Sequence, residues 1–313
     1  MTRLVLHRLA TGLVLLLVVS AVTFVLTALV PGDPARAILG LNAPQEAYEA
    51  LRIKLGLDHP IWVQYANYMS GVFQGSLGTS LTSNEPVTKV LGQRVPVTLS
   101  LVVLTTIFCA VLGLLLGTLS AIRGGVLGRI VDVLSLAGLA LPSFWVALVL
   151  VAVLAVQLRA FPATGYISLT DSPGLWLWSL TLPVVALGLS GVSTVAKQTR
   201  DAMLEVLDRD HIRTLRANGL SQRSIIWRHA LRNASIPVTT VLGLVFVSLL
   251  SGAVFAEAVF VLPGLGLLAV SATQRHDVPI IEGIALYFTV MVVIANLAID
   301  LLYGLLNPKV RTR

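Results

Sequence analysis

The stretch VTLSLVVLTTIFCAVLGLLLGTLSAI, residues 97–122, contains no charged side chain over 26 residues. A helix crosses the roughly 30 Å hydrocarbon core of a bilayer with about 20 apolar residues, because each residue rises about 1.5 Å. The stretch therefore predicts a membrane-spanning helix. The whole chain fits this environment, since 56% of its 313 residues are hydrophobic and 12% are charged, compared with about 25% charged in soluble domains.

Five further apolar runs are long enough to cross a bilayer. The six predicted spans are residues 9–30, 97–122, 130–156, 175–195, 236–258 and 280–305. The first follows basic residues, as a secretory signal peptide does. Its apolar run exceeds the roughly 7–15 residues of such signals and Leu29-Val30-Pro31 is a poor cleavage site, so we expect a retained signal anchor. The predicted fold class is all-α, a polytopic membrane protein with six transmembrane helices.

The distribution of basic residues predicts the orientation of these spans. Loops on the cytoplasmic side are enriched in Lys and Arg. With both termini inside, the cytoplasmic pieces hold 15 of the 22 Lys and Arg residues, eight of them between Lys197 and Arg232. Both termini are therefore predicted to be cytoplasmic. This asymmetry also explains most of the net charge of +7, so nucleic-acid binding is not expected.

The predicted organisation has two parts. Residues 1–96 comprise the N-terminal span, 9–30, and a long extracytoplasmic loop, and residues 97–313 form a five-span core with a cytoplasmic loop at 197–235. Within the outer loop, APQEAYEALRIKLGL (43–57) and IWVQYANYMSGVF (61–73) place apolar residues at helical spacing. We expect two amphipathic helices that lie against the outer membrane–water boundary, where Tyr and Trp are favoured.

Residues that could carry catalysis or bind a metal are scattered. None of the four lysines follows a glycine, so the chain lacks a phosphate-binding P-loop. The five histidines and the single cysteine, Cys109, show no metal-ligand spacing. No catalytic residue, metal site or cofactor is predicted for this chain. If it moves a solute by using ATP, the energy comes from a partner.

Four acidic residues fall inside or at the edge of predicted spans: Asp132, Glu257, Glu282 and Asp300. A charge at the bilayer centre is costly, and carriers coupled to protons or sodium place ionisable groups near the midplane. All four lie within a turn or two of a span end. This placement disfavours such a carrier and favours interfacial ion pairs, for example between Asp132 and Arg129.

The stretch RTLRANGLSQRSIIWRHALRNASIP, residues 213–237, carries five arginines and no acidic residue between two predicted spans. We expect two short helices joined at Gly219, because glycine tolerates the left-handed conformation that ends a helix. Asp208 or Asp210 is predicted to cap the first helix, and Ser221 the second. The hairpin is either an inert loop on anionic lipid or a docking element for a cytoplasmic motor protein.

Several motifs resemble the permease subunits of ATP-binding-cassette (ABC) importers, specifically the first-permease type of dipeptide, oligopeptide and nickel uptake systems. Residues 213–237 resemble the EAA motif of that family, with Gly219 as its fixed glycine and Ile236-Pro237 as its closing pair, although Arg213-Thr214-Leu215 replace Glu-Ala-Ala. The other similar stretches are VPGDPARA (30–37), LGLDHPIWVQYANYMSGVFQGSLGTS (55–80), LPSFWVALVL (141–150), SGAVFAEAVFVLPGLG (251–266) and DLLYGLLNPKVR (300–311). Ser76 and Asn307 stand where the family usually has Asp.

The resemblance implies a type I ABC importer permease in a bacterial plasma membrane. Its partners would be a second homologous permease, two ATPases or one fused ATPase that bind ATP and Mg, an extracytoplasmic solute-binding protein, and membrane lipid. The implied ATPase-docking residues are Asp210, Arg213, Thr214, Leu215, Arg216, Ala217, Asn218 and Gly219.

Path or gate residues are less sharply marked. Pro142 is predicted to bend its span, or is simply tolerated there. Small polar residues in spans line a path or serve helix packing. The candidates are Pro142, Ser143, Ser251 and Glu257. A stand-alone secondary transporter or channel, and a non-transporting membrane scaffold, are the alternative functions.

Overall fold

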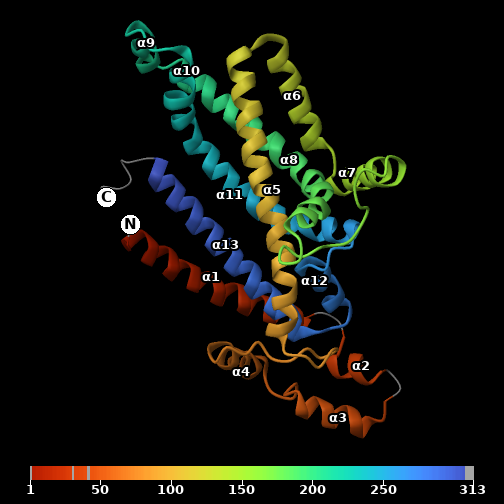
Figure 1. Cartoon of the computed structure of the whole chain (residues 1–313). Helices are drawn as coiled ribbons and strands as arrows, with labels where there is room; N and C mark the ends of the chain where they lie inside the picture. The colour runs from red at the N-terminus through yellow and green to blue at the C-terminus, as the bar shows by residue number, and fades with distance from the viewer. Residues whose placement is uncertain (1, 30–31, 41–42, 307–313) are drawn as a thin grey trace. The chain divides into compact units, whose positions relative to one another are not determined.

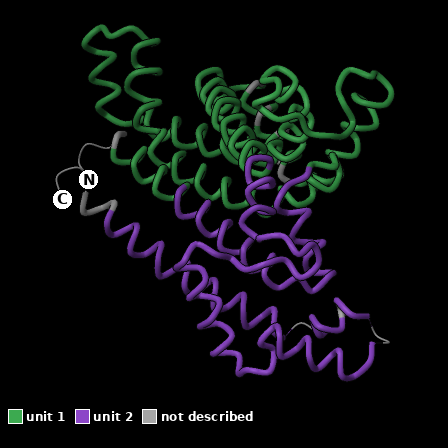
Figure 2. Tube along the Cα trace, turned by 60° about the horizontal axis from the view of Figure 1, so that its bottom comes forward, with its two compact units in different colours: residues 1, 98–262, 295–313 green, residues 2–97, 263–294 purple. Residues whose placement is uncertain are grey.

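The computed structural model describes residues 2–29, 32–40 and 43–306, and it is built from helices (Figure 1). The residues Val30-Pro31 and Asn307–Arg311 of the quoted motifs, and the basic C-terminal tail, lie outside this described part. The chain divides into two compact units (Figure 2). Unit 1 comprises Thr98–Leu262 and the described residues from Ala295 onward, and unit 2 comprises Thr2–Val97 and Pro263–Ile294.

Within the described residues, five helices are long and apolar enough to cross a membrane. They are α1 (Thr2–Leu29), α5 (Val87–Arg123), α8 (Pro173–Leu207), α11 (Leu231–Phe260) and α13 (Val278–Leu306). Each contains one predicted span, although residue 30, the end of the first predicted span, lies outside the described residues. The helix α5 begins about three turns before its apolar run, and α8 ends about three turns after its run. These extensions remain helical because they adjoin a formed helix, in which each added residue gains a backbone hydrogen bond.

The third predicted span, 130–156, is not one continuous helix. It consists of α6 (Gly125–Ala140), α7 (Ser143–Leu150) and the π-helical segment η1 (Val151–Gln157). Leu141 is extended, with ψ of 124°, and Pro142 directly precedes α7. Proline disfavours helical backbone at the residue before it and has no N–H to donate, so α6 ends here. The predicted bend at Pro142 is a complete break.

Unit 1 is assembled around α8, which packs against α6, α7 and α11. Small residues set the close approach of helices, as is common in membranes. A Cβ on Gly117 of α5 would lie 2.4 Å from the carbonyl oxygen of Ala196, and one on Gly191 would lie 2.6 Å from Sγ of Cys109. Cys109 is buried.

The predicted ion pair between Asp132 and Arg129 is wrong. The Asp132 carboxylate on α6 instead accepts from Nη1 of Arg200 on α8 at 2.6 Å. The guanidinium and the carboxylate are both partly shielded from solvent. The pair therefore ties α6 to α8, a tertiary contact rather than a contact within one helix turn.

Unit 2 contains the outer loop, in which both predicted amphipathic helices are confirmed. They are α3 (Gln45–Lys54) and α4 (Ile61–Phe73), preceded by α2 (Pro34–Leu39), and the later part of the unit contains α12 (Leu265–Gln274). Asp277 fixes the turn before α5, because its carboxylate accepts from the hydroxyl of Ser80 at 2.6 Å and from the backbone N–H of Leu81 at 3.1 Å.

Candidate coupling site

The basic stretch between α8 and α11 forms a helical hairpin. It consists of α9 (Asp210–Ala217), α10 (Gln222–Ser224) and the π-helical segment η2 (Ile225–Ala230), which continues into α11. Ser221 is confirmed as a cap, since its hydroxyl accepts from the N–H of Ser224 at 3.3 Å. The predicted cap at Asp208 or Asp210 is wrong. Arg209 occupies the cap position of α9, and no side chain caps this helix.

Gly219 reverses the chain between the two helices, as predicted. Its φ is +77°, a left-handed conformation that residues with a Cβ adopt at a cost. Its N–H donates to the carbonyl of Arg216 at 3.0 Å, and the N–H of Leu220 donates to Leu215 at 3.2 Å. A Cβ on Gly219 would meet no atom within 4 Å, so the requirement for glycine comes from the backbone and not from crowding.

An apolar cluster fixes this hairpin to the ends of α8 and α11. Ile212 of α9 is fully buried against Met203 on α8, Ile225 on η2 and Ala234 on α11, and Leu215 is partly buried beside them. Burying an Ile side chain stabilises a fold by about 1.5–3 kcal/mol. The hairpin is therefore held by its own core and is more than a flexible connection between two spans.

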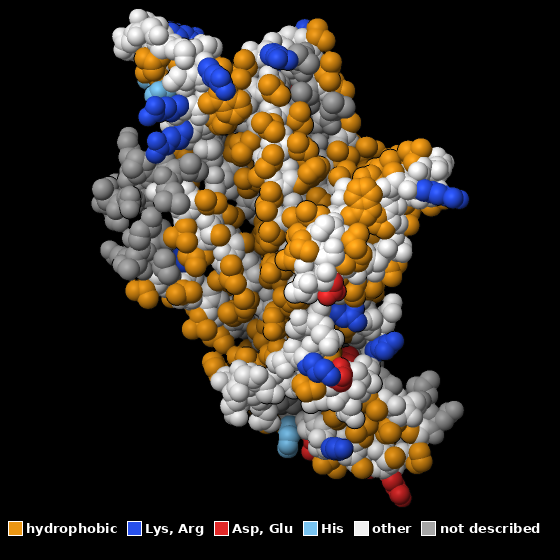
Figure 3. Space-filling model, in the orientation of Figure 1, with side chains coloured by type: hydrophobic (Ala, Val, Ile, Leu, Met, Phe, Trp, Pro, Cys, Tyr) orange, Lys and Arg blue, Asp and Glu red, His pale blue; other side chains and the backbone are white. Residues whose placement is uncertain are grey.

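The opposite face of α9 is polar and exposed. Arg213 lies between two carboxylates, with Nη atoms 3.4 Å from Asp208 and 3.6 Å from Asp210. Arg216 is exposed and makes no ion pair within the described residues. Lys and Arg side chains gather at this end of unit 1 (Figure 3). The hairpin thus presents cationic and hydrogen-bonding groups on a rigid support.

The remaining predicted docking residues lie on the same exposed surface. Thr214, Ala217 and Asn218 are exposed, and the hydroxyl of Thr214 donates to the carbonyl of Asp210 at 3.2 Å. The sequence-based set therefore forms one contiguous face, except for Leu215, which contributes to the anchoring cluster.

The predicted path residues are not gathered into one site. Pro142 and Ser251 are exposed on the surface of unit 1, and Ser143 is half-buried at the start of α7. Glu257 is fully buried and accepts from the hydroxyl of Thr98 at 2.6 Å. This contact joins residues 159 positions apart in the sequence. The sequence marks both groups as polar residues within apolar stretches but does not indicate that they pair.

Two family models together match most of the chain. The model described as "Binding-protein-dependent transport system inner membrane component" matches residues 111–312, and its N-terminal companion matches residues 1–102. The chain is 40% identical over 312 residues to a Brucella abortus protein named as a peptide transport system permease, and 99% of each chain is covered. It is 36% identical over 336 residues to the dipeptide transport system permease protein DppB of Escherichia coli K12, again with 99% of each covered.

A solved structure shares the fold. The inward-facing MetNI methionine ABC transporter matches with a TM-score of 0.56 at 17% identity, over 70% of this chain and 97% of that one. The fold is thus that of a multi-pass membrane subunit of an ABC importer. The chain belongs to the family of binding-protein-dependent transport system inner membrane components. It is a permease subunit of the bacterial plasma membrane and not an enzyme, since ATP hydrolysis in such systems is the task of partner ATPases.

Proposed function

We propose that this chain forms half of the translocation path of an ABC importer for peptides. The observation that carries the substrate class is the identity of 36–40% to permeases named for peptide and dipeptide transport, over almost the full length of each chain. A second, homologous permease supplies the other half of the path. An extracytoplasmic solute-binding protein delivers the peptide.

We further propose that α9 and the turn at Gly219 dock into a groove of a cytoplasmic ATPase. Two ATPases, or one fused ATPase, bind ATP and Mg and supply the energy. Three features support this role: the anchoring of Ile212, the exposed polar face of α9, and the prediction from Lys and Arg distribution that this loop is cytoplasmic. Because the hairpin is anchored on α8 and α11, a force on α9 passes directly into two spans.

The proposed cycle is alternating access. Closure of the ATP-bound ATPase pair moves the docked hairpins of both permeases, the spans rock, and the path opens outward; hydrolysis resets the inward-open state. ATP drives this change only through its different affinity for the two states. In this cycle the permease positions the solute and gates its path, and the partner transfers the phosphoryl group.

Two substitutions test the docking role. Gly219→Val should cost about 1–3 kcal/mol because valine is strained at a left-handed position, and it should distort the turn. Arg216→Glu should weaken docking, because the new carboxylate would repel acidic groups of the ATPase groove or lose a contact that the arginine makes. Arg216→Lys should retain most of the docking affinity. The measurements are co-purification of the ATPases and transport-coupled ATP hydrolysis in liposomes of neutral lipid.

The matched control for the glycine is Gly165→Val. Gly165 also has a positive φ, +101°, and open space around its Cβ position, but it lies far from the hairpin in the sequence. The Gly165→Val substitution should leave assembly with the ATPases intact. Normal assembly and coupling in both Gly219→Val and Arg216→Glu would reject the docking role and favour a loop that only contacts lipid.

A further inference from the structure

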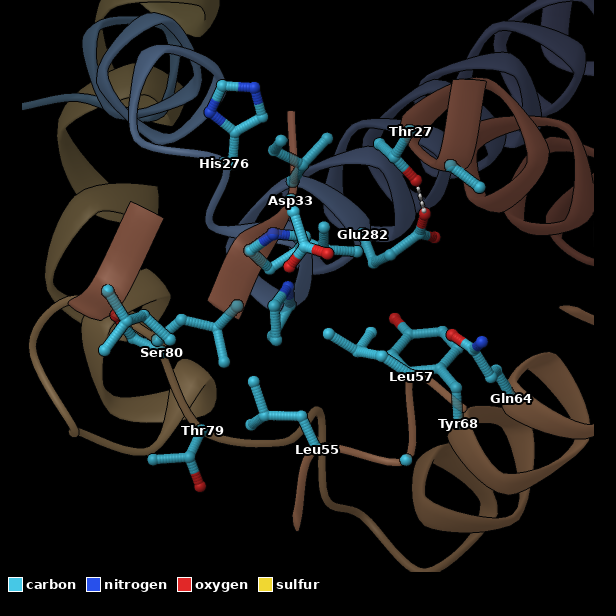
Figure 4. A pocket seen from close by; sticks show the side chains of 18 of the residues that line it. Thr27, Asp33, Leu55, Leu57, Gln64, Tyr68, Thr79, Ser80, His276 and Glu282 are labelled. Carbon is cyan, nitrogen blue, oxygen red and sulfur yellow. Dashed lines mark hydrogen bonds between the residues drawn. The ribbon is translucent and has the colours of Figure 1, made fainter. Parts of the chain in front are cut away.

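Unit 2 contains a cavity of about 790 Å³ that the proposed transport function does not use. Its walls come from the end of α1, the outer loop with α3 and α4, and the beginning of α13 (Figure 4). The volume is within the range of about 300–1,000 Å³ typical of sites for small molecules. Apolar side chains such as Phe24, Leu55 and Leu57 line it together with a similar number of polar and charged side chains.

Glu282 is the polar group in this cavity that most needs a partner. Its side chain is 1% exposed, and one carboxylate oxygen accepts from the hydroxyl of Thr27 at 3.3 Å. The other oxygen, Oε2, has no hydrogen-bond partner among the residues that the structure describes. Glu282 also makes no ion pair within the described residues. A buried carboxylate is costly unless a counter-charge and hydrogen bonds satisfy it.

Tyr68 of α4 places a second unsatisfied oxygen in the same part of the cavity. Its hydroxyl is buried and has no hydrogen-bond partner within the described part of the chain. Figure 4 shows its ring and the amide of Gln64 on the side of the cavity where Glu282 and Thr27 meet. Burial, and then the nearby Glu282 carboxylate, raise the pKa of Tyr68. The hydroxyl therefore keeps its proton and remains available as a neutral acceptor and donor.

Asp33, the other carboxylate of the cavity wall, is already satisfied. Its two oxygens accept from the N–H of Ala35 at 2.8 Å and the hydroxyl of Tyr48 at 2.6 Å, and Nε of Arg52 lies 3.8 Å away. Burial raises the pKa of Asp33, but these hydrogen bonds and the Arg52 charge outweigh it and lower the pKa overall. Asp33 therefore has its own cation, whereas Glu282 has none among the described residues.

We propose that this cavity binds a primary ammonium group, with Glu282 as its counter-ion. An ammonium has three donors and no acceptor, which fits Oε2 of Glu282, the hydroxyl oxygen of Tyr68 and the amide oxygen of Gln64. The apolar wall contacts the body of the ligand. The ammonium belongs either to a soluble amine or to the headgroup of an aminophospholipid. This site does not depend on the proposed peptide transport.

The test uses the full chain in nanodiscs of phosphatidylcholine, which has no N–H donor. The probe is leucinamide at pH 7.2, where most of its α-amino groups are charged, and N-acetylleucinamide is the neutral control. Titration calorimetry should show that leucinamide binds and that N-acetylleucinamide does not. Glu282→Gln should weaken it by tenfold or more, which corresponds to about 1.4 kcal/mol, and Tyr68→Phe should weaken it severalfold.

Tyr65→Phe is the matched control for Tyr68→Phe. Tyr65 lies on the same helix, and its hydroxyl donates to the carbonyl of Leu17 at 3.3 Å outside the cavity, so leucinamide binding should be unchanged.

Nanodiscs with phosphatidylethanolamine distinguish the two sources of the ammonium group. If phosphatidylethanolamine weakens the binding of leucinamide, the natural ligand is the lipid headgroup. If the affinity for leucinamide is unchanged, the natural ligand is a soluble amine. Equal binding of N-acetylleucinamide, equal binding by the Glu282→Gln protein, or no binding of leucinamide without competing lipid would overturn the proposal.

Discussion

The helices α8 and α1 are both apolar enough to span a membrane, yet they are buried to very different extents. In α8, 56% of an apolar stretch of 18 residues is buried within the chain, whereas in α1 the share is 11%. The difference shows that apolar character alone does not decide which span lies in the interior. Lipid is as apolar as a leucine side chain, so hydrophobicity gives two spans little reason to associate.

Small side chains account for the burial of α8. Its buried residues include Ala186, Gly188, Gly191, Ser193 and Ala196, and such residues let neighbouring helix backbones approach closely. In α1, large side chains such as Leu13, Val14 and Val18 are more than half exposed. The surface of α1 is therefore suited to contact with lipid or another subunit, while α8 is the centre of its own unit.

The largest expected effect comes from adding bulk where α5 meets α8. At Gly117→Val, the new Cβ would lie 2.4 Å from the Ala196 carbonyl oxygen and 2.6 Å from Cβ of Thr199. Backbone cannot easily move away, so overpacking should destabilise the protein by about 3 kcal/mol. The same change at Gly92, in the same helix but with nothing within 4 Å, is the control. The thermal unfolding of the two purified variants should differ clearly; equal midpoints would contradict the close packing of α8.

Much of this architecture is predictable from the sequence, because apolar runs of about 20 residues permit few alternatives in a membrane. The turn at Gly219 and the cap at Ser221 were also predictable, since both depend on local backbone chemistry. The break before α7 was only partly predicted. Pro142 indicates a bend, but the extended backbone of Leu141 follows from its position before the proline.

The sequence does not predict contacts between residues that lie far apart along the chain. Arg129 was the nearest basic residue to Asp132 in sequence, but Arg200 reaches it from 68 positions away because α6 packs on α8. Glu282 was recognisable as an acid near a span end, but nothing local indicates that Thr27 and Tyr68 lie beside it. Local sequence encodes helices and turns, whereas these partners depend on which helix faces pack together.

A smaller effect is expected from the polar contact of α8. Arg200→Ala should cost about 1–2 kcal/mol, because it removes a charged hydrogen bond to Asp132 between partly shielded groups. Lys197→Ala is the control on the same helix: its pair with Asp201, at 3.2 Å, is about half exposed and should be worth about 0.3–0.5 kcal/mol. A double-mutant cycle of Arg200 and Asp132 isolates their coupling energy. Coupling no larger than that of Lys197 and Asp201 would show that small-residue packing alone holds α8 to α6.

The smallest effect is expected on the exposed face of α1. Leu13 is 56% exposed, so in the isolated chain we expect its side chain to face lipid both in the folded state and when the helices separate within the membrane. Leu13→Ala should therefore change the stability of the isolated chain by less than about 0.5 kcal/mol. Leu180→Ala in α8 is the matched control. Leu180 is fully buried, and the same truncation should cost about 2–5 kcal/mol because it leaves a cavity. Equal losses would refute the contrast between the helices. A loss for Leu13→Ala that occurs only in the assembled transporter would sharpen it, because it would show that another subunit, and not lipid, covers this face of α1.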